Sequence, residues 1–471
     1  MAILFGLIAV TTNPIIISLA VALIVGVILL TKVDWIVWSI LSLGLLVAGL
    51  LPLFFDYFTS KAAWGVSLLG SVLMLIALIK IVITPDARRN TPAFVWIALA
   101  FVAYALINSL VQWHSFWEVV SGFKRYFQAW GLLFVLCWMT FNKQQIHNWK
   151  IFFLFVALLQ LPFAIYERIV YVPIREGIKH LYPGMVPIDV VGGTFGASIT
   201  GGGASAEMVA FLIVMLAFLV ARRKEKLLSN NKFFLLALII LAPLLLSEVK
   251  AIIVMLPLIF ITIYRGEMLV QFHYKLIGFV AITAFIVVAS YAYIFALSQN
   301  QSNEMSMSKY IEDTLAYNIY DKGHASNVLN RRTVLSFWIE KQGLHDPISF
   351  VFGNGLGSSH FTGGHVFMRY PGYGIGLTGA STLLWETGFL GFCIFVAILV
   401  SAWISAEQLR RQTTIPEIRA DALAIQAALA VFTFCLFYRV GILEIISFQI
   451  LFATLLGYLG WMHCVGTRIN D

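Results

Sequence analysis

Charged residues are scarce in this chain. Of its 471 residues only 11% are Asp, Glu, Lys or Arg, whereas 60% are hydrophobic. A soluble domain carries about 25% charged residues, and no soluble core could bury this much apolar surface. Internal repeats, low-complexity tracts and a separate soluble domain are also missing from the sequence. Lipid is therefore the expected solvent for most of the chain.

Cysteine and metal-binding patterns are equally sparse. The four cysteines lie in or beside apolar runs and form no Cys-x-x-Cys pair, so disulfides and metal sites have little support. His360 and His365 have no acidic or cysteine cluster nearby, and we predict neither a metal nor another cofactor. The net charge of +8 favours contact with anionic lipid or an anionic substrate, not with nucleic acid.

Long apolar runs take the place of these missing features. Many approach the ~20 residues that cross a bilayer as a helix, and they lack the alternation of a transmembrane β-barrel. We predict an all-α, polytopic membrane protein with about 12–13 transmembrane helices, the first being a retained span and not a cleaved signal peptide. The expected spans are 10–31, 35–56, 62–84, 92–112, 126–141, 151–170, 203–221, 233–248, 251–265, 275–297, 380–405, 421–438 and 442–462.

Lysine and arginine predict the orientation, because they accumulate in cytoplasmic loops. The loops on one side hold Lys32, Arg88, Arg89, Lys143, Lys150, Arg222, Arg223, Lys224, Lys226, Arg265, Arg410, Arg411, Arg419 and Arg468. The opposite side receives 113–125, 171–202 and 298–379. We therefore expect N-terminal transmembrane helices in 1–297, one large extracytoplasmic loop in 298–379 and C-terminal transmembrane helices in 380–471.

Some basic residues break this rule and lie on the outer side or at its membrane edge. Six of them are Arg125, Arg168, Lys250, Arg331, Arg332 and Arg439. Charge at that depth is costly, so it is usually paired or functional. Ion pairs are one interpretation, with Glu248 beside Lys250 and Glu444 near Arg439. The other is an outward-facing cationic pocket for a phosphorylated ligand, because the guanidinium group binds phosphate with two hydrogen bonds.

Other outer-side residues have a structural and a functional interpretation. The glycine-rich stretches 192–196 and 353–357 form either turns or a close approach to phosphate, and they lack the βαβ context of a nucleotide motif. His360 and His365 are either solvated or proton acceptors, and Glu386 either caps its helix or acts as a base. The aromatic residues of the loop either stack on sugar rings or form the loop core; they are Trp338, Phe361, Tyr370 and Tyr373.

Three ordered motifs resemble those of the O-antigen ligase and polymerase superfamily. Residues 193–196 read Gly-Thr-Phe-Gly and precede a span. Asn330-Arg331-Arg332, then Trp338, lead to a glycine-rich stretch at 352–357, and residues 384–391 read Leu-Trp-Glu-Thr-Gly-Phe-Leu-Gly. The order and the large outer loop between spans match that superfamily over about residues 190 to 400.

The resemblance implies a GT-C-like membrane glycosyltransferase in the bacterial inner membrane, with its large loop periplasmic or extracellular. Such enzymes are metal-independent, and direct displacement inverts the sugar carbon. They move a glycan from undecaprenyl pyrophosphate to another lipid-linked glycan in polymerases, or to lipid A core in ligases. The six basic residues then bind the pyrophosphate, and Glu386, His360 or His365 accepts the proton. Expected partners are lipid-linked oligosaccharide donor and acceptor, membrane lipid, a flippase and a chain-length regulator.

The sequence differs from the superfamily at two places, and the first, a missing ligase-type histidine, favours a polymerase of exopolysaccharide, capsule or O-antigen. Leu377-Thr378 stands where many members have a His-Asn pair, and Ser247-Glu248-Val249-Lys250 stands for a Ser-Arg-Gly element. A ligase remains the alternative within the enzyme class. Outside that class, the sequence also allows a lipid-linked glycan transporter, or a scaffold of a polysaccharide export complex.

Overall fold

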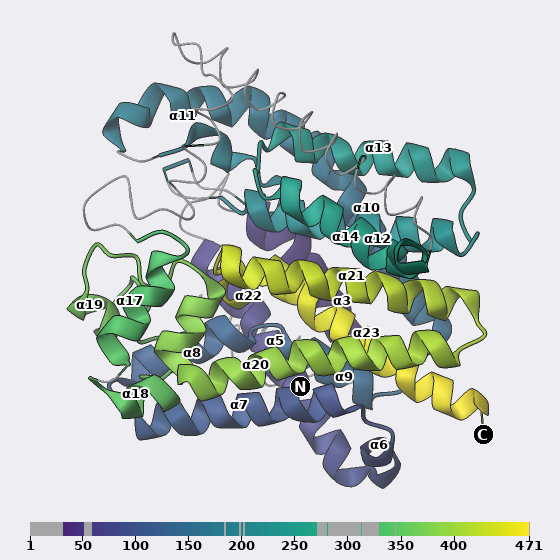
Figure 1. The fold of residues 1–471 in the computed structure, drawn as a ribbon, viewed down its shortest axis with the longest axis horizontal. Coiled ribbons are helices and arrows are strands. Elements are labelled where there is room, and N and C mark those ends of the chain that lie inside the picture. Colours follow the sequence, from purple (N-terminus) through teal and green to yellow (C-terminus); the bar gives the residue numbers. More distant parts are fainter. Residues whose placement is uncertain are drawn as a thin grey trace, which may run out of the picture.

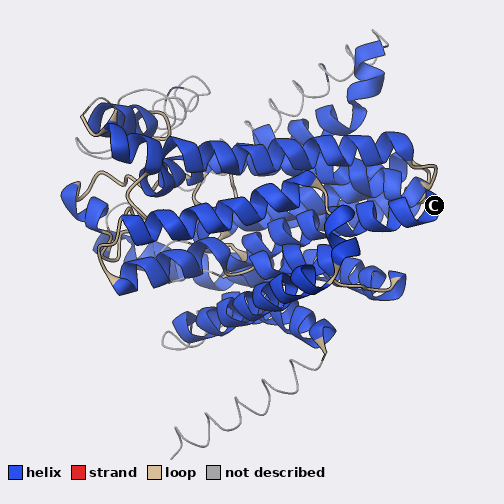
Figure 2. Cartoon of the chain, turned by 90° about the horizontal axis from the view of Figure 1, so that it is seen from below, coloured by secondary structure: helices blue, strands red, loops and turns tan. Residues whose placement is uncertain are grey.

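The regular structure of the described chain is entirely helical (Figure 2). The computed structural model describes residues 32–50, 59–182, 185–196, 199–200, 203–270, 329–343 and 345–470, with 280 and 312. Within these residues the all-α prediction is confirmed. The spans predicted at 10–31 and 275–297, and nearly all loop residues from 298 to 328, lie outside the described residues.

Eight helical stretches of the described chain are long and apolar enough to cross a membrane, which confirms a multi-pass protein. They are Val33–Leu50 (α3, Val33–Ser42, and η1, Leu43–Val47), Trp64–Ile83 (within α5, Thr59–Ile83), α7 (Ala93–Val111), Lys143–Leu181, α12 (Ser205–Lys224), α20 (Gly379–Gln412), α21 (Pro416–Tyr438) and Ile446–Cys464 (within α23, Ile446–Asn470). Shorter or kinked helices take three further predicted places: α9 (Trp130–Trp138), α13 (Asn230–Leu246) and α14 (Ile252–Val270).

The helix at 126–141 is shorter than predicted. α9 has nine residues, all buried, and so measures about 14 Å, less than half of the hydrocarbon thickness. α8 (Phe116–Phe127) precedes it, and the helix is interrupted between the two at Gln128 and Ala129. The prediction of one span here was wrong because the apolar run continues across a break that hydropathy does not register.

The helix predicted at 151–170 begins earlier and ends later. α10 (Lys143–Tyr166) starts with a capping box, in which Asn142 accepts from the Gln145 backbone and the Gln145 side chain accepts from the Asn142 backbone. It continues through η2 (Glu167–Tyr171), α11 (Val172–Ile178) and η3 (Lys179–Leu181). The first two turns of α10 are rich in polar residues. A prediction based on the apolar run alone therefore places the start of the helix too late in the sequence.

Three helices form the centre of the bundle. The membrane-crossing stretches of α12, α21 and α23 are 83%, 78% and 78% buried, whereas the other five are 33–44% buried. Glycine allows close packing beside them: a Cβ on Gly131 of α9 would clash with the Gly70 carbonyl of α5. Figure 1 shows α20, α21 and α23 running side by side along the long axis.

The two ends of the bundle differ. α8, α17 (Thr333–Gln342), α18 (Pro347–Phe352) and α19 (His365–Arg369) gather where α20 begins, and we call this the loop end (Figure 1). α22 (Gly441–Glu444) lies beside α8 at the same end. α20 runs to the opposite end, where Arg410 and Arg411 form its last turn, and we call this the basic end.

Candidate functional site

Glu386 anchors the glycine-rich loop at the loop end. It is fully buried and is the eighth residue of α20. Its Oε2 accepts a hydrogen bond from the Gly357 N–H at 2.9 Å, and its Oε1 accepts from the N–H and the hydroxyl of Ser359 at 3.2 and 2.8 Å. A carboxylate held by three donors and closed off from solvent fixes a loop. This geometry favours a structural role for Glu386 over the role of a base.

Glycine is required in this loop by its backbone. Gly353 and Gly357 have φ of +82° and +90°, a region that other residues rarely adopt. A Cβ on Gly357 would clash with the Glu118 carbonyl oxygen of α8. The loop therefore packs tightly between α8 and α20. The N–H group of Gly357 binds a carboxylate of the same chain instead of a phosphate. This agrees with a turn, one of the two interpretations of residues 353–357.

The other glycine-rich segment uses the same arrangement. Gly193, in η5 (Gly193–Phe195), donates its N–H to Oε2 of Glu167 at 2.7 Å, and Thr194 donates its N–H to Oε1 of Gln160 at 2.9 Å. Glu167 and Gln160 are both fully buried. Each glycine-rich motif thus closes on a buried glutamate instead of an open phosphate cradle.

His365 and Glu118 form a carboxylate–imidazole pair. Nδ1 of His365 lies 2.7 Å from Oε1 of Glu118, and the His114 ring lies 4.6 Å from the His365 ring, centroid to centroid. Ser115 caps α8 by accepting from the Glu118 N–H, which places Glu118 in the first turn. With Nδ1–H donating to the carboxylate, Nε2 of His365 keeps its lone pair. This is the arrangement that a general base requires.

His360 is held in the opposite tautomer. Its Nδ1 accepts from the Thr362 N–H at 3.2 Å, so the hydrogen of the neutral ring lies on Nε2. That Nε2 faces Oε1 of Glu444 at 3.9 Å. The two loop histidines are therefore not equivalent: His365 presents a lone pair at Nε2, and His360 presents an N–H. Among the three predicted bases the geometry favours His365.

Arg125 continues this site along α8. Its Nη1 lies 3.1 Å from Oε1 of Glu444, and its Nη2 is buried without a hydrogen-bond partner among the described residues. Arg125 is only 9% exposed, so this N–H group points into the protein. Burial raises the pKa of the Glu444 carboxyl, and the Arg125 guanidinium opposes that shift. Arg125 and Glu118 are seven residues apart, so they share one face of α8.

Two more predicted arginines meet at the junction of α21 and α22. Arg331 donates its Nε–H to the Tyr438 carbonyl at 2.7 Å and lies 4.2 Å above the Tyr438 ring. Arg439 donates to the Gly203 carbonyl at 2.9 Å and lies 3.5 Å from Oε1 of Glu207. Because α22 carries Glu444, the structure brings Arg125, Arg331 and Arg439 to one corner of the loop end.

The other three predicted basic residues lie elsewhere at this end. Arg168, in η2, pairs with Oε1 of Glu248 at 2.9 Å. Lys250 lies in the turn between α13 and α14, and Arg332 is the N-cap residue of α17. The predicted ion pairs need correction: Glu248 bonds to Arg168 and Glu444 to Arg125, because the partners come from helices far apart in sequence. Pairing itself, one of the two interpretations, is found at Arg125, Arg168 and Arg439.

Most loop aromatic residues form a core. Trp338 stacks on Phe350 at 4.4 Å between ring centroids, and Tyr373 stacks on Phe337 at 4.9 Å. Tyr370 packs at the edge of the same cluster. Phe361 differs, because it is 68% exposed and lies against the His360 ring. Of the four aromatic candidates for sugar stacking, Phe361 is the one that stands open to solvent.

Sequence reasoning missed Glu118, His114 and Glu207. A signal existed for Glu118, since Ser-x-x-Glu before a helix is a capping pattern. Glu207 stands in a long apolar run, where an ionisable residue usually has a partner. In the part of the chain that the structure describes, no three His, Cys, Asp or Glu side chains are placed to hold one metal ion.

Comparisons with known proteins add no relatives. No protein-family model matches the chain, and no curated protein matches it.

Proposed function

We propose that this protein is a polysaccharide polymerase on the outer face of a bacterial inner membrane. It joins undecaprenyl-pyrophosphate-linked repeat units of an exopolysaccharide, capsule or O-antigen. One observation carries the proposal: Glu118, the partner of His365, shares a face of α8 with Arg125, beside the loop that Glu386 holds. A proton acceptor and a phosphate-binding group thus lie at the same end of the bundle.

The His365 imidazole acts on the acceptor sugar in this proposal. Nε2 accepts the proton of the acceptor hydroxyl as its oxygen attacks the anomeric carbon of the donor. The new glycosidic bond forms as the bond from that carbon to the pyrophosphate oxygen breaks, which inverts the sugar carbon. Glu118, 2.7 Å from Nδ1, stabilises the imidazolium that results. Phe361, exposed beside His360, offers an aromatic face to the acceptor sugar.

The leaving undecaprenyl pyrophosphate gains negative charge, which Arg125 is placed to stabilise. Its Nη2 is buried, so the pyrophosphate reaches the guanidinium group through Nη1, the nitrogen that Glu444 holds. Glu444 competes for Arg125 while it is ionised. Burial raises the pKa of Glu444, so this carboxyl releases Arg125 by taking up a proton more readily than an exposed acid does.

A ligase is the second candidate within the enzyme class. Ligases of the resembled superfamily use a histidine where this chain has Leu377-Thr378. Thr378 caps α20 here, since its hydroxyl accepts from the Ser381 N–H at 3.0 Å and bonds to the Ser381 hydroxyl. A capping threonine cannot accept the proton of a sugar hydroxyl at neutral pH. The chain therefore fits a polymerase better.

Elongation in detergent tests the proposal. The purified protein is incubated with a lipid-linked repeat unit, and glycan length is read on a gel. A polymerase gives a ladder, and His365→Ala removes it, whereas His345→Ala at an exposed loop position leaves it intact. A transporter or scaffold gives no ladder. A ligase gives product only when lipid A core is added. Either result rejects the polymerase.

A further inference from the structure

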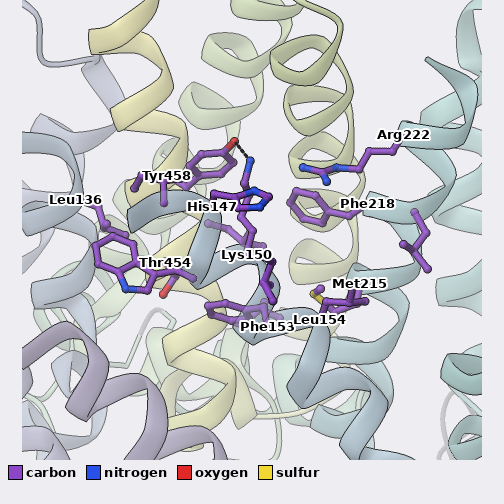
Figure 3. A pocket seen from close by; sticks show the side chains of 16 residues that line it. Leu136, His147, Lys150, Phe153, Leu154, Met215, Phe218, Arg222, Thr454 and Tyr458 are labelled. Carbon is purple, nitrogen blue, oxygen red and sulfur yellow. Dashed lines mark hydrogen bonds between the residues drawn. The ribbon is translucent and has the colours of Figure 1, made fainter. Parts of the chain in front are cut away.

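A cavity lies at the basic end of the bundle, away from the proposed glycan site. It has a volume of about 130 Å³, is lined by α9, α10, α12 and α23, and is open at one side. Figure 3 shows His147, Lys150, Arg222 and Tyr458 at one side of it, and Phe153, Leu154 and Met215 at the other. The cavity is therefore amphipathic, with a cationic entrance and an apolar interior.

The helix directions place the cationic entrance toward the basic end. Along α10 the polar lining residues His147 and Lys150 come before Phe153, and α10 runs from the basic end to the loop end. Along α12, which runs the other way, Met215 comes before Arg222. The cations thus lie nearer the predicted cytoplasmic surface, and the apolar walls lie deeper. This is the orientation that a phospholipid has in the inner leaflet.

The entrance keeps an uncompensated positive charge. Lys150 and Arg222 share a single carboxylate, Asp421, at 3.1 and 3.0 Å, and Asp421 is fully buried. Tyr458 donates to the same carboxylate at 2.7 Å. Two cations and one anion leave a formal charge of +1. The side chains of Lys150 and Arg222 are 30% and 33% exposed, so both remain accessible to a further anion.

Two buried donors in the cavity wall lack a bond. The Trp149 indole N–H and the Thr454 hydroxyl both line the cavity, and neither has a hydrogen-bond partner among the described residues. Trp149 is 3% exposed and Thr454 is 9% exposed. Buried donors of this kind usually have partners, because an unmade hydrogen bond costs about 1–3 kcal/mol. The cavity wall therefore holds unused polar groups behind its apolar surface.

We propose that this cavity binds one acidic phospholipid of the cytoplasmic leaflet, such as phosphatidylglycerol. The phosphate bonds to Lys150 and Arg222, and an acyl chain lies along Phe153 and Met215. Charge complementarity selects this occupant, since a zwitterionic lipid would bring its own cation to an entrance that is already positive. Free phosphate would leave the apolar interior empty. The inference does not rest on the proposed polymerase activity.

Native mass spectrometry of the purified, delipidated protein tests this inference. With equimolar phosphatidylglycerol and phosphatidylethanolamine, we expect the acidic lipid to be retained roughly tenfold more. The triple variant Lys150→Gln, Arg222→Gln, Asp421→Asn lowers the net charge by one without leaving a buried carboxylate, and it loses this preference. Lys143→Gln makes the same net change at the start of α10, outside the cavity, and keeps the preference.

Two further measurements keep the inference open to refutation if the triple variant fails to fold. Met215→Trp fills the apolar side and leaves the cations in place, so it should lower lipid retention while Arg222→Lys retains it. Glycerol phosphate at a large excess should not displace the lipid. Equal retention of the two lipids, unchanged retention in Met215→Trp, or displacement by glycerol phosphate would each overturn a phospholipid site.

Discussion

Nδ1 of His365 lies 2.7 Å from Oε1 of Glu118, although 247 positions separate the two residues in the sequence. One comes from the short helix α19 of the large loop and the other from the first turn of α8. The contact joins the loop to the membrane-embedded bundle and orients the imidazole. The proposed chemistry depends on this orientation.

Glu118→Gln should lower the rate of glycan elongation by about 100-fold without unfolding the protein. An amide holds the ring less firmly and cannot stabilise an imidazolium. The rate is measured across pH 5–9 with a lipid-linked repeat unit. Glu340→Gln, at an exposed position of α17, is the matched control and should keep the wild-type profile. Equal activity of the two variants would show that Glu118 has no part in proton transfer.

Arg125→Gln should raise the KM for the lipid-linked donor by at least about tenfold, because a charged hydrogen bond to phosphate is lost. Arg125→Lys should recover part of the lost donor affinity, since it restores the charge but not the paired N–H donors of the guanidinium group. The KM and kcat are determined separately in detergent. Arg369→Gln, on the exposed part of α19, serves as the control. A donor KM unaffected by Arg125→Gln argues against pyrophosphate binding at this position.

Stability should depend on pH through Glu444. Burial raises its pKa in the folded protein above the unfolded value near 4.5. The folded state therefore binds the proton more tightly, and this favourable contribution is complete below the unfolded pKa. It declines as pH rises from about 4.5 through the folded pKa. Thermal unfolding between pH 4 and 8 measures this decline.

The Glu444→Gln variant isolates that contribution. Its Tm should fall less steeply between pH 4 and 8 than that of the wild type, because the titrating carboxyl is gone. His360 lies close to Glu444, with 3.9 Å between Nε2 and Oε1, so His360→Gln is examined in parallel. Identical pH profiles for Glu444→Gln and the wild type would mean that burial does not raise the pKa of this group.

Gly357→Ala should destabilise the loop end more than Gly372→Ala. Both glycines have positive φ, +90° and +85°, which costs an alanine about 1 kcal/mol or more. A Cβ at Gly357 also clashes with the Glu118 carbonyl, whereas the space around Gly372 is open. Thermal unfolding gives the difference. An equal decrease in Tm for the two variants would show that the contact between the loop and α8 accommodates the added Cβ without loss of stability.

Hydropathy predicted the start of a span well where no polar turns precede the apolar run. It placed α7 and α20 within one residue of their N-terminal ends. It failed at α10, whose first turns are polar, and at α9, where a break interrupts an apolar run. Helix ends are determined by caps and breaks, which depend on a few side chains and leave mean hydropathy almost unchanged.

The site was harder to predict than the fold. The motifs assigned Glu386 and the glycine-rich loop to the same superfamily pattern, and in the structure the two are in contact. The ion pairs were assigned to sequence neighbours, whereas Glu444 bonds to Arg125, 319 positions away. A carboxylate selects its partner by distance in the folded bundle. Sequence alone does not give that distance.

We propose that this chain forms glycosidic bonds with His365 as the proton acceptor. The most direct measurement counts undecaprenyl pyrophosphate released and linkages formed by the purified protein in detergent. The wild type should release one undecaprenyl pyrophosphate for each new linkage, and His365→Ala should lower both rates by about 100-fold or more. Absence of released undecaprenyl pyrophosphate in the wild type, or full activity of His365→Ala, would contradict this account.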